Sequence, residues 1–98
     1  MPFEMGDIVS WESHGVLKQG TVAGIIKGGH KAGDLPPQWL KQYLLQFPKT
    51  APARADESYL VRVPHGKNKP KLFWPHAELL VLVNRPVSMD ESSIGEAQ

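Results

Sequence analysis

Cysteine is absent from this chain of 98 residues. Its absence excludes disulfides, thiolate metal ligands and a cysteine nucleophile. No apolar run approaches the roughly 18 residues that a membrane-spanning helix needs, and no charged segment followed by an apolar one opens the chain. We therefore expect a soluble, cytoplasmic protein.

The motifs of common active sites are also missing. The four histidines lie too far apart in the sequence for paired metal ligation, and no serine stands in a Gly-x-Ser-x-Gly sequence. The glycine-rich segment 24–31 lacks the Gly-Lys-Ser/Thr ending of a phosphate-binding loop. The sequence therefore predicts no catalytic residue, no metal and no cofactor.

What the chain does contain fits one small domain. Nine prolines, nine glycines and a hydrophobic fraction of 41% favour short strands and turns over long helices. The formal net charge is +1, but Asp90, Glu91 and Glu96 place −3 in residues 89–98 and leave +4 in residues 1–88. We predict a mildly basic domain over residues 1–86 and a disordered acidic tail over 87–98.

Two short apolar-alternating runs, each opened by glycine, occupy residues 6–11 and 20–26. They predict two antiparallel strands joined by a loop. Alternate residues of a strand share a face, so we expect Val9 and Trp11 to point inward and Ile8 to lie near the rim.

In the second run, Val22 and Ile26 share parity and are expected on one face, with Gly24 between them marking a bend. Residues 59–63 form a clear alternating strand with an inward set of Tyr59, Val61 and Val63. The remaining sheet segments are expected at residues 71–74 and 80–83, with a single tight turn of helix at 75–79.

Residues 28–57 interrupt this series of strands. Within them, apolar residues recur at helical spacing, which predicts a helix of about ten residues over 38–47 that Pro48 ends: Trp39, Leu40, Tyr43, Leu44 and Phe47. A strand over 43–47 is the alternative. The aromatic set Trp39, Tyr43 and Phe47 can either cover an opening of the sheet or dock a partner, since Trp and Tyr are favoured interface anchors.

The order strand, loop, strand, long insert, strand, hairpin, strand, one-turn helix, strand resembles a Src-homology-3-like small barrel. Within that class, the segments 6–11 (GDIVSW) and 20–23 (GTVA) are similar to the bacterial Tudor-like family associated with hypervirulence. The segments 59–61 (YLV) and 74–75 (WP) resemble those of many small bacterial barrels. This resemblance implies a mainly β fold, a five-stranded barrel with a helical insert between strands 2 and 3, and it carries over no biochemical role.

A more distant resemblance is to type II, plasmid-borne dihydrofolate reductase, through the segments 5–7 (MGD), 20–22 (GTV) and 74–75 (WP). That enzyme is a tetramer around a pore, to which the strand before the proline supplies a polar Gln, an Ile and a Tyr. The matching positions here are Leu72, Phe73 and Trp74. Because Leu72 has no hydrogen-bonding group for a pterin or nicotinamide, reductase activity is a remote alternative.

The best candidate site is the basic hairpin 62–74. In an extended chain Lys67, Lys69 and Lys71 share parity and could project together. A basic loop can follow a phosphate backbone, and an outward Trp74 could stack on bases. The competing interpretation is a solvated turn whose lysines discourage edge pairing, with Trp74 in the core. The candidate residues are Arg62, His65, Lys67, Lys69, Lys71 and Trp74.

Together these features predict a non-enzymatic binding module that contacts a protein partner through the insert and the barrel rim. Nucleic-acid binding through the hairpin 62–74 is the alternative. We expect no membrane contact. Formation of an oligomer is a further alternative, and Ile8, Leu60 and Leu72 are the candidate contact patch for it.

Overall fold

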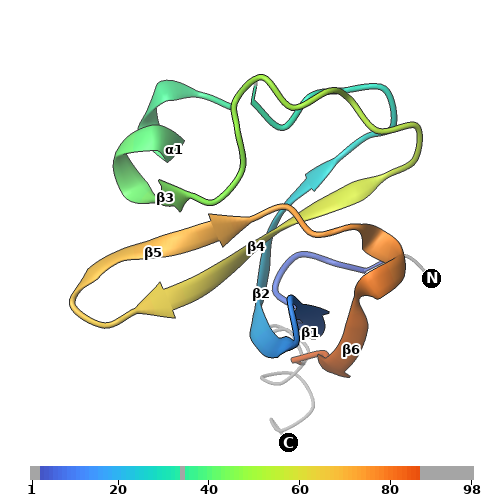
Figure 1. Ribbon diagram of the computed structural model, residues 1–98, viewed down its shortest axis with the longest axis vertical. Coiled ribbons are helices and arrows are strands. Elements are labelled where there is room, and N and C mark those ends of the chain that lie inside the picture. Colours follow the sequence, from blue (N-terminus) through green and yellow to red (C-terminus); the bar gives the residue numbers. More distant parts are fainter. Residues whose placement is uncertain (1–2, 34, 87–98) are drawn as a thin grey trace, which may run out of the picture.

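Six strands form one mixed sheet in the computed structural model, which describes residues 3–33 and 35–86 (Figure 1). The predicted mainly β composition is confirmed, and neither described helix is long and apolar enough to cross a membrane. The predicted acidic tail 87–98 lies outside the described residues. In chain order the elements are β1 (Ile8–Ser13), β2 (Val16–Ile26), α1 (Pro37–Gln42), β3 (Leu44–Leu45), β4 (Ser58–His65), β5 (Asn68–Phe73), the 3₁₀ turn η1 (Ala77–Leu79) and β6 (Val81–Asn84).

The strand order across the sheet is β3-β5-β4-β2-β1-β6, and all neighbours are antiparallel except β3 and β5. This arrangement differs from the predicted five-stranded barrel in two ways. The insert adds the short strand β3, because Leu44 and Leu45 pair with Lys71 and Leu72 of β5. The sheet also does not close, so β3 and β6 remain its two edges.

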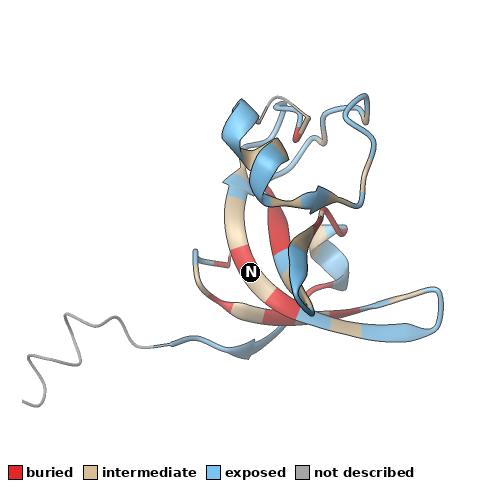
Figure 2. Cartoon of the chain, turned by 90° about the vertical axis from the view of Figure 1, so that its left-hand side faces the viewer, coloured by how far each residue is buried: buried red, intermediate tan, exposed pale blue. Residues whose placement is uncertain are grey.

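One face of the coiled sheet holds the first core. Val9 and Trp11 of β1 pack with Val22 of β2 and with Tyr59 and Val61 of β4, and all five are buried (Figure 2). The inward positions predicted for β1 and β4 are therefore confirmed. This core also includes Phe3 before β1 and Leu80 before β6, so the segments that lead into these two paired strands both pack against it.

The second core lies on the opposite face of the central strands, beneath the insert. Leu60 of β4 and Leu72 of β5 are fully buried there, together with Ala32 and Trp74. The insert supplies the covering side chains, which include Leu35, Trp39, Tyr43, Leu45 and Phe47. The predicted contact patch of Ile8, Leu60 and Leu72 is therefore wrong, because the insert removes two of its three members from the surface.

The insert is helical only in its first half. Helix α1 ends at Gln42, and Tyr43 is extended with its backbone N–H bonded to the Trp39 carbonyl. The chain then runs parallel to β5, and Gln46 N–H donates to the Leu72 carbonyl at 2.9 Å. The helix predicted over 38–47 is thus correct to Gln42, and the alternative strand is correct for Leu44–Leu45. Backbone pairing with β5 outweighs the helical spacing of the apolar residues.

A β-bulge divides β2 between the two cores. Pairing with β4 shifts between Val22 and Gly24, which inserts one residue and reverses the alternation of faces. Val22 therefore belongs to the first core and Ile26 packs against the second, so the prediction that they share a face is wrong. The bend expected at Gly24 is confirmed by this bulge.

Candidate functional site

The β4–β5 hairpin projects from the body of the molecule as a two-stranded ribbon (Figures 1 and 2). In the described sheet, β2 pairs with β4 as far as Arg62, and β3 pairs with β5 only at Lys71 and Leu72. The ribbon is therefore the segment 63–70. Gly66 at its tip has φ of +58°, a conformation that glycine adopts without steric cost.

The basic side chains predicted for the site gather on and beside this ribbon. Arg62, Lys67 and Lys69 are exposed, whereas His65 and Lys71 are half-buried. Among the described residues, the ion pairs within 4.0 Å involve Arg85 alone, so none neutralises the arginine and the three lysines of this set. Residues 58–77 also contain no Asp or Glu. The ribbon is thus a cluster of unpaired positive charge.

Lys18 of β2 joins the cluster. It pairs with Trp11 across β1 and β2, and its ammonium lies 5.3 Å from the centroid of the Phe73 ring, within cation–π range. Lys18 was not predicted for the site, because it lies more than forty positions before the hairpin in the sequence. The alternation of β2 was the available signal, since it places Lys18 and Val22 on one face.

The cations do not share one face of the ribbon. Arg62 is opposite Leu72, whereas Lys71 is opposite Val63, and neighbouring residues of a strand point to opposite faces. Arg62 and Lys71 therefore lie on opposite faces. The register also shifts between Val63 and His65, so the shared parity of the three lysines does not place them together.

Trp74 is a core residue, and the prediction that it stacks on a base is wrong. Only 5% of Trp74 is exposed, and its indole N–H donates to the Ser58 hydroxyl at 2.8 Å. The guanidinium of Arg54 lies 3.9 Å from the centre of its ring and donates to the carbonyls of Trp74 and Pro75, each at 2.8 Å. Burial lowers the pKa of Arg54 because desolvation disfavours the charged form.

The three aromatic residues of the insert are half-buried against the second core. The rings of Trp39 and Tyr43 lie 5.3 Å apart, and Phe47 meets Trp74 edge-on at 5.8 Å. These contacts support the interpretation of Trp39, Tyr43 and Phe47 as a cover over the sheet. Their predicted role in docking a partner stays a prediction.

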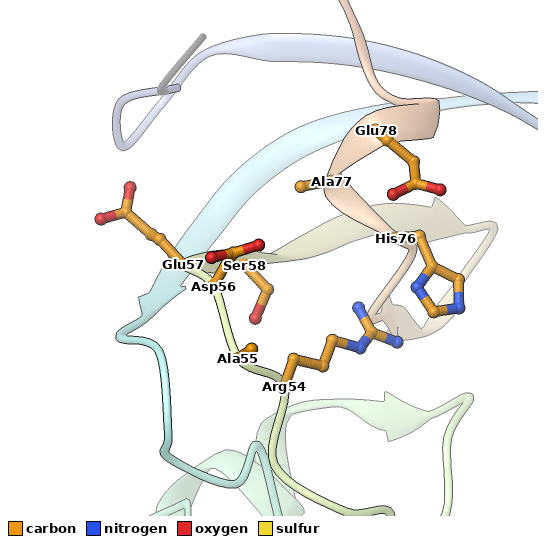
Figure 3. Close-up of a pocket in the computed structure, with 8 residues that line it drawn as sticks. All are labelled: Arg54, Ala55, Asp56, Glu57, Ser58, His76, Ala77 and Glu78. Atoms are coloured by element: carbon orange, nitrogen blue, oxygen red, sulfur yellow. The ribbon is translucent and has the colours of Figure 1, made fainter.

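A small polar cavity of about 250 Å³ lies at the far end of β4, away from the ribbon tip (Figure 3). Segment 54–58 and segment 76–78 line it, and they bring Asp56, Glu57 and Glu78 to its walls. Figure 3 shows Glu57 and Glu78 at opposite sides of the cavity, with Arg54 reaching toward His76. Among the described residues, no three carboxylate, histidine or cysteine side chains are grouped to hold a metal ion.

The polar side chains Glu57 and Ser58 of this cavity are already hydrogen-bonded to other residues of the protein. The Tyr59 hydroxyl donates to Glu57 at 2.7 Å and accepts from the Phe3 N–H at 3.2 Å. Burial, and then the bond to Glu57, raise the pKa of Tyr59. Ser58 is buried and accepts from Trp74, so its hydroxyl is not exposed for nucleophilic attack.

The two ends of the β4–β5 pair therefore differ in charge. The ribbon carries cations without carboxylates, whereas the cavity at the other end is lined by three carboxylates together with Arg54. Comparison with protein-family models, with curated proteins and with solved structures finds no match to this chain.

Proposed function

We propose that this protein is a non-enzymatic, cytoplasmic module that binds nucleic acid through the cationic ribbon. The observation that carries the proposal is the charge cluster itself: Lys18, Arg62, Lys67, Lys69 and Lys71 have no carboxylate partner among the described residues. Unpaired cations that bind phosphates release condensed counterions, and this release supplies most non-specific affinity for nucleic acid. A projecting ribbon can reach phosphates without interference from the body.

The fold supports a binding role in a second way. When the short strand β3 is left out, the other five strands, with a one-turn helix before the last, follow the chain order expected for the small-barrel class that the sequence resembles. We propose that β1, β2, β4, β5 and β6 form an opened version of that scaffold and that the insert is an addition to it. A reductase-like function has less support, because Leu72 and Trp74 are buried beneath the insert.

Salt dependence tests the proposal. If all five cations contact phosphates, the logarithm of the association constant for a DNA oligonucleotide should fall with the logarithm of salt concentration with a slope of about −4 to −5. Changing Lys67 and Lys69 together to Ala should reduce that slope by about 2. Fluorescence anisotropy at several salt concentrations measures both values.

The matched control is Lys31→Ala with Lys49→Ala. These two lysines are exposed and lie in the insert, outside the ribbon. The control should keep the wild-type slope and affinity. Equal losses in the two double variants, or binding that does not respond to salt, would show that the ribbon is not the site.

Contact with a protein partner is the second candidate function, and β6 favours it. All four residues of this edge strand are exposed, with Val81 at 61% and Val83 at 49%. An open edge with apolar side chains can add a strand from another chain. Val81→Lys would place a charge at such a contact without burying it in the free protein, and it should weaken capture of any partner.

A further inference from the structure

We infer that the ribbon inserts into the major groove of double-stranded DNA. The inference rests on the proposed function and names the nucleic acid that this geometry fits. The major groove of B-DNA is about 12 Å wide and 8.5 Å deep, and it admits a two-stranded β-ribbon. A β-sheet with side chains on both faces is about 10 Å thick, so the ribbon fits across such a groove with one face toward each wall.

The length of the free hairpin also fits. Val63 packs against the first core, and residues 64–66 continue beyond it without a third strand, which corresponds to a projection of about 10 Å at the usual rise of a strand. That projection exceeds the depth of the groove. The tip can therefore reach the floor of the groove while the body stays outside.

The distribution of charge matches a groove better than a flat surface. Arg62 and Lys71 lie on opposite faces of the hairpin, and Lys67 and Lys69 lie at its exposed end. A ribbon inside a groove has a phosphate backbone on each side. Cations on both faces would then each meet a phosphate wall, whereas on a flat anionic surface one face would point away.

Single strands fit less well because the hairpin offers no exposed ring for base stacking. Tyr59 and Trp74 are buried. Phe73 is half-buried, with its edge against Trp11 at 5.5 Å and Lys18 over its ring. The major groove of double-stranded RNA is deep and narrow, so it excludes the ribbon. Duplex DNA remains as the ligand that the geometry accepts.

Binding of the full chain to three ligands of one sequence tests this inference. A 24-base-pair DNA duplex, the corresponding RNA duplex and one DNA strand are titrated at the same salt concentration. We expect the DNA duplex to bind at least about tenfold more tightly than either of the others, which is about 1.4 kcal/mol. Methylation by dimethyl sulfate then reports the groove, because guanine N7 lies in the major groove and adenine N3 in the minor groove.

The expected footprint is protection of guanine N7 with adenine N3 unchanged. The Lys67→Ala/Lys69→Ala variant should lose this protection, and the Lys31→Ala/Lys49→Ala control should keep it. Equal affinity for the RNA duplex or the single strand, or protection of adenine N3, overturns the inference and leaves the proposed function standing. If none of the three ligands binds at low salt, both are wrong.

Discussion

At the scale of single residues, one partly buried ion pair joins parts of the chain that are distant in sequence. Asp7 is only 1% exposed and accepts two hydrogen bonds from the Arg85 guanidinium, at 3.0 and 2.8 Å. These bonds hold the pKa of the Asp7 carboxyl below its ordinary value of 3.8. Because Arg85 follows β6 and Asp7 precedes β1, the pair fastens the edge strand β6 to the first strand.

Asp7→Asn should destabilise the fold by about 1–3 kcal/mol, because a charged hydrogen-bonded pair is lost. The contribution of Asp7 to stability should also depend on pH. A carboxyl whose folded pKa is lowered stabilises the protein above the unfolded pKa, and this stability is lost as the pH falls below about 3.8 toward the folded pKa. Denaturant titrations of wild type and variant between pH 7 and pH 3 measure it.

The difference in unfolding free energy between wild type and Asp7→Asn should therefore shrink at acid pH. Glu12→Gln is the matched control, since this carboxylate on β1 is exposed. A constant difference across the pH range would show that Asp7 acts through packing rather than charge.

At the scale of elements, the bulge in β2 is what lets one strand serve two cores. A Cβ atom on Gly24 would lie 3.2 Å from both Leu60 Cδ1 and Trp39 Cη2, which is closer than most side chains tolerate. The missing side chain therefore allows α1 to approach the sheet. Gly24 therefore lies at the bend of β2 and also leaves the space in which the insert packs on the sheet.

Gly24→Val should cost about 1–3 kcal/mol of unfolding free energy, because the added methyl groups overpack the contact between Trp39 and Leu60. The Trp39 environment should change as well, and fluorescence of a Trp11→Phe/Trp74→Phe background reports it. Gly29→Ala is the control for altering a glycine of the insert, since no atom lies within 4 Å of its added carbon. Its positive φ of +85° adds local strain, so Trp39 fluorescence rather than stability separates the two variants.

At the scale of the whole molecule, the sheet contributes side chains to a separate core on each of its faces. The first core contains Trp11 and Tyr59, and the second contains Leu60, Leu72 and Trp74 beneath the insert. The sequence predicted residues 28–57 as an insert in a small barrel. The structure shows that side chains of this insert bury one face of the central strands of the sheet.

Replacing residues 28–57 by a short Gly-Ser linker should therefore destabilise the protein severely. Exposing Leu60, Leu72 and Trp74 would cost about 1.5–3 kcal/mol for each side chain, against a total stability of about 5–15 kcal/mol for a typical domain. Thermal unfolding and binding of an apolar dye measure the effect. A shortened chain that melts with the wild-type protein would show that the first core is sufficient by itself.

The sequence by itself determined the strands whose apolar residues alternate without interruption. Val9 and Trp11, and then Tyr59 and Val61, were placed correctly because the period of a strand is local. It also identified the ribbon cations, since their charge does not depend on the fold. The helix α1 was expected for the same reason, because the apolar residues recur at helical spacing from Trp39 onward.

Only the tertiary structure decided the features that depend on a neighbouring strand. The chain changes from the helix α1 to the strand β3 because its backbone pairs with β5. Ile26 packs against the second core instead of the first because the register of β2 shifts against β4. Three further contacts join residues that are distant in the sequence: Trp74 with the insert, Lys18 with Phe73 and Asp7 with Arg85. Contacts of this kind leave no local period or motif, because they arise only when separate segments pack together.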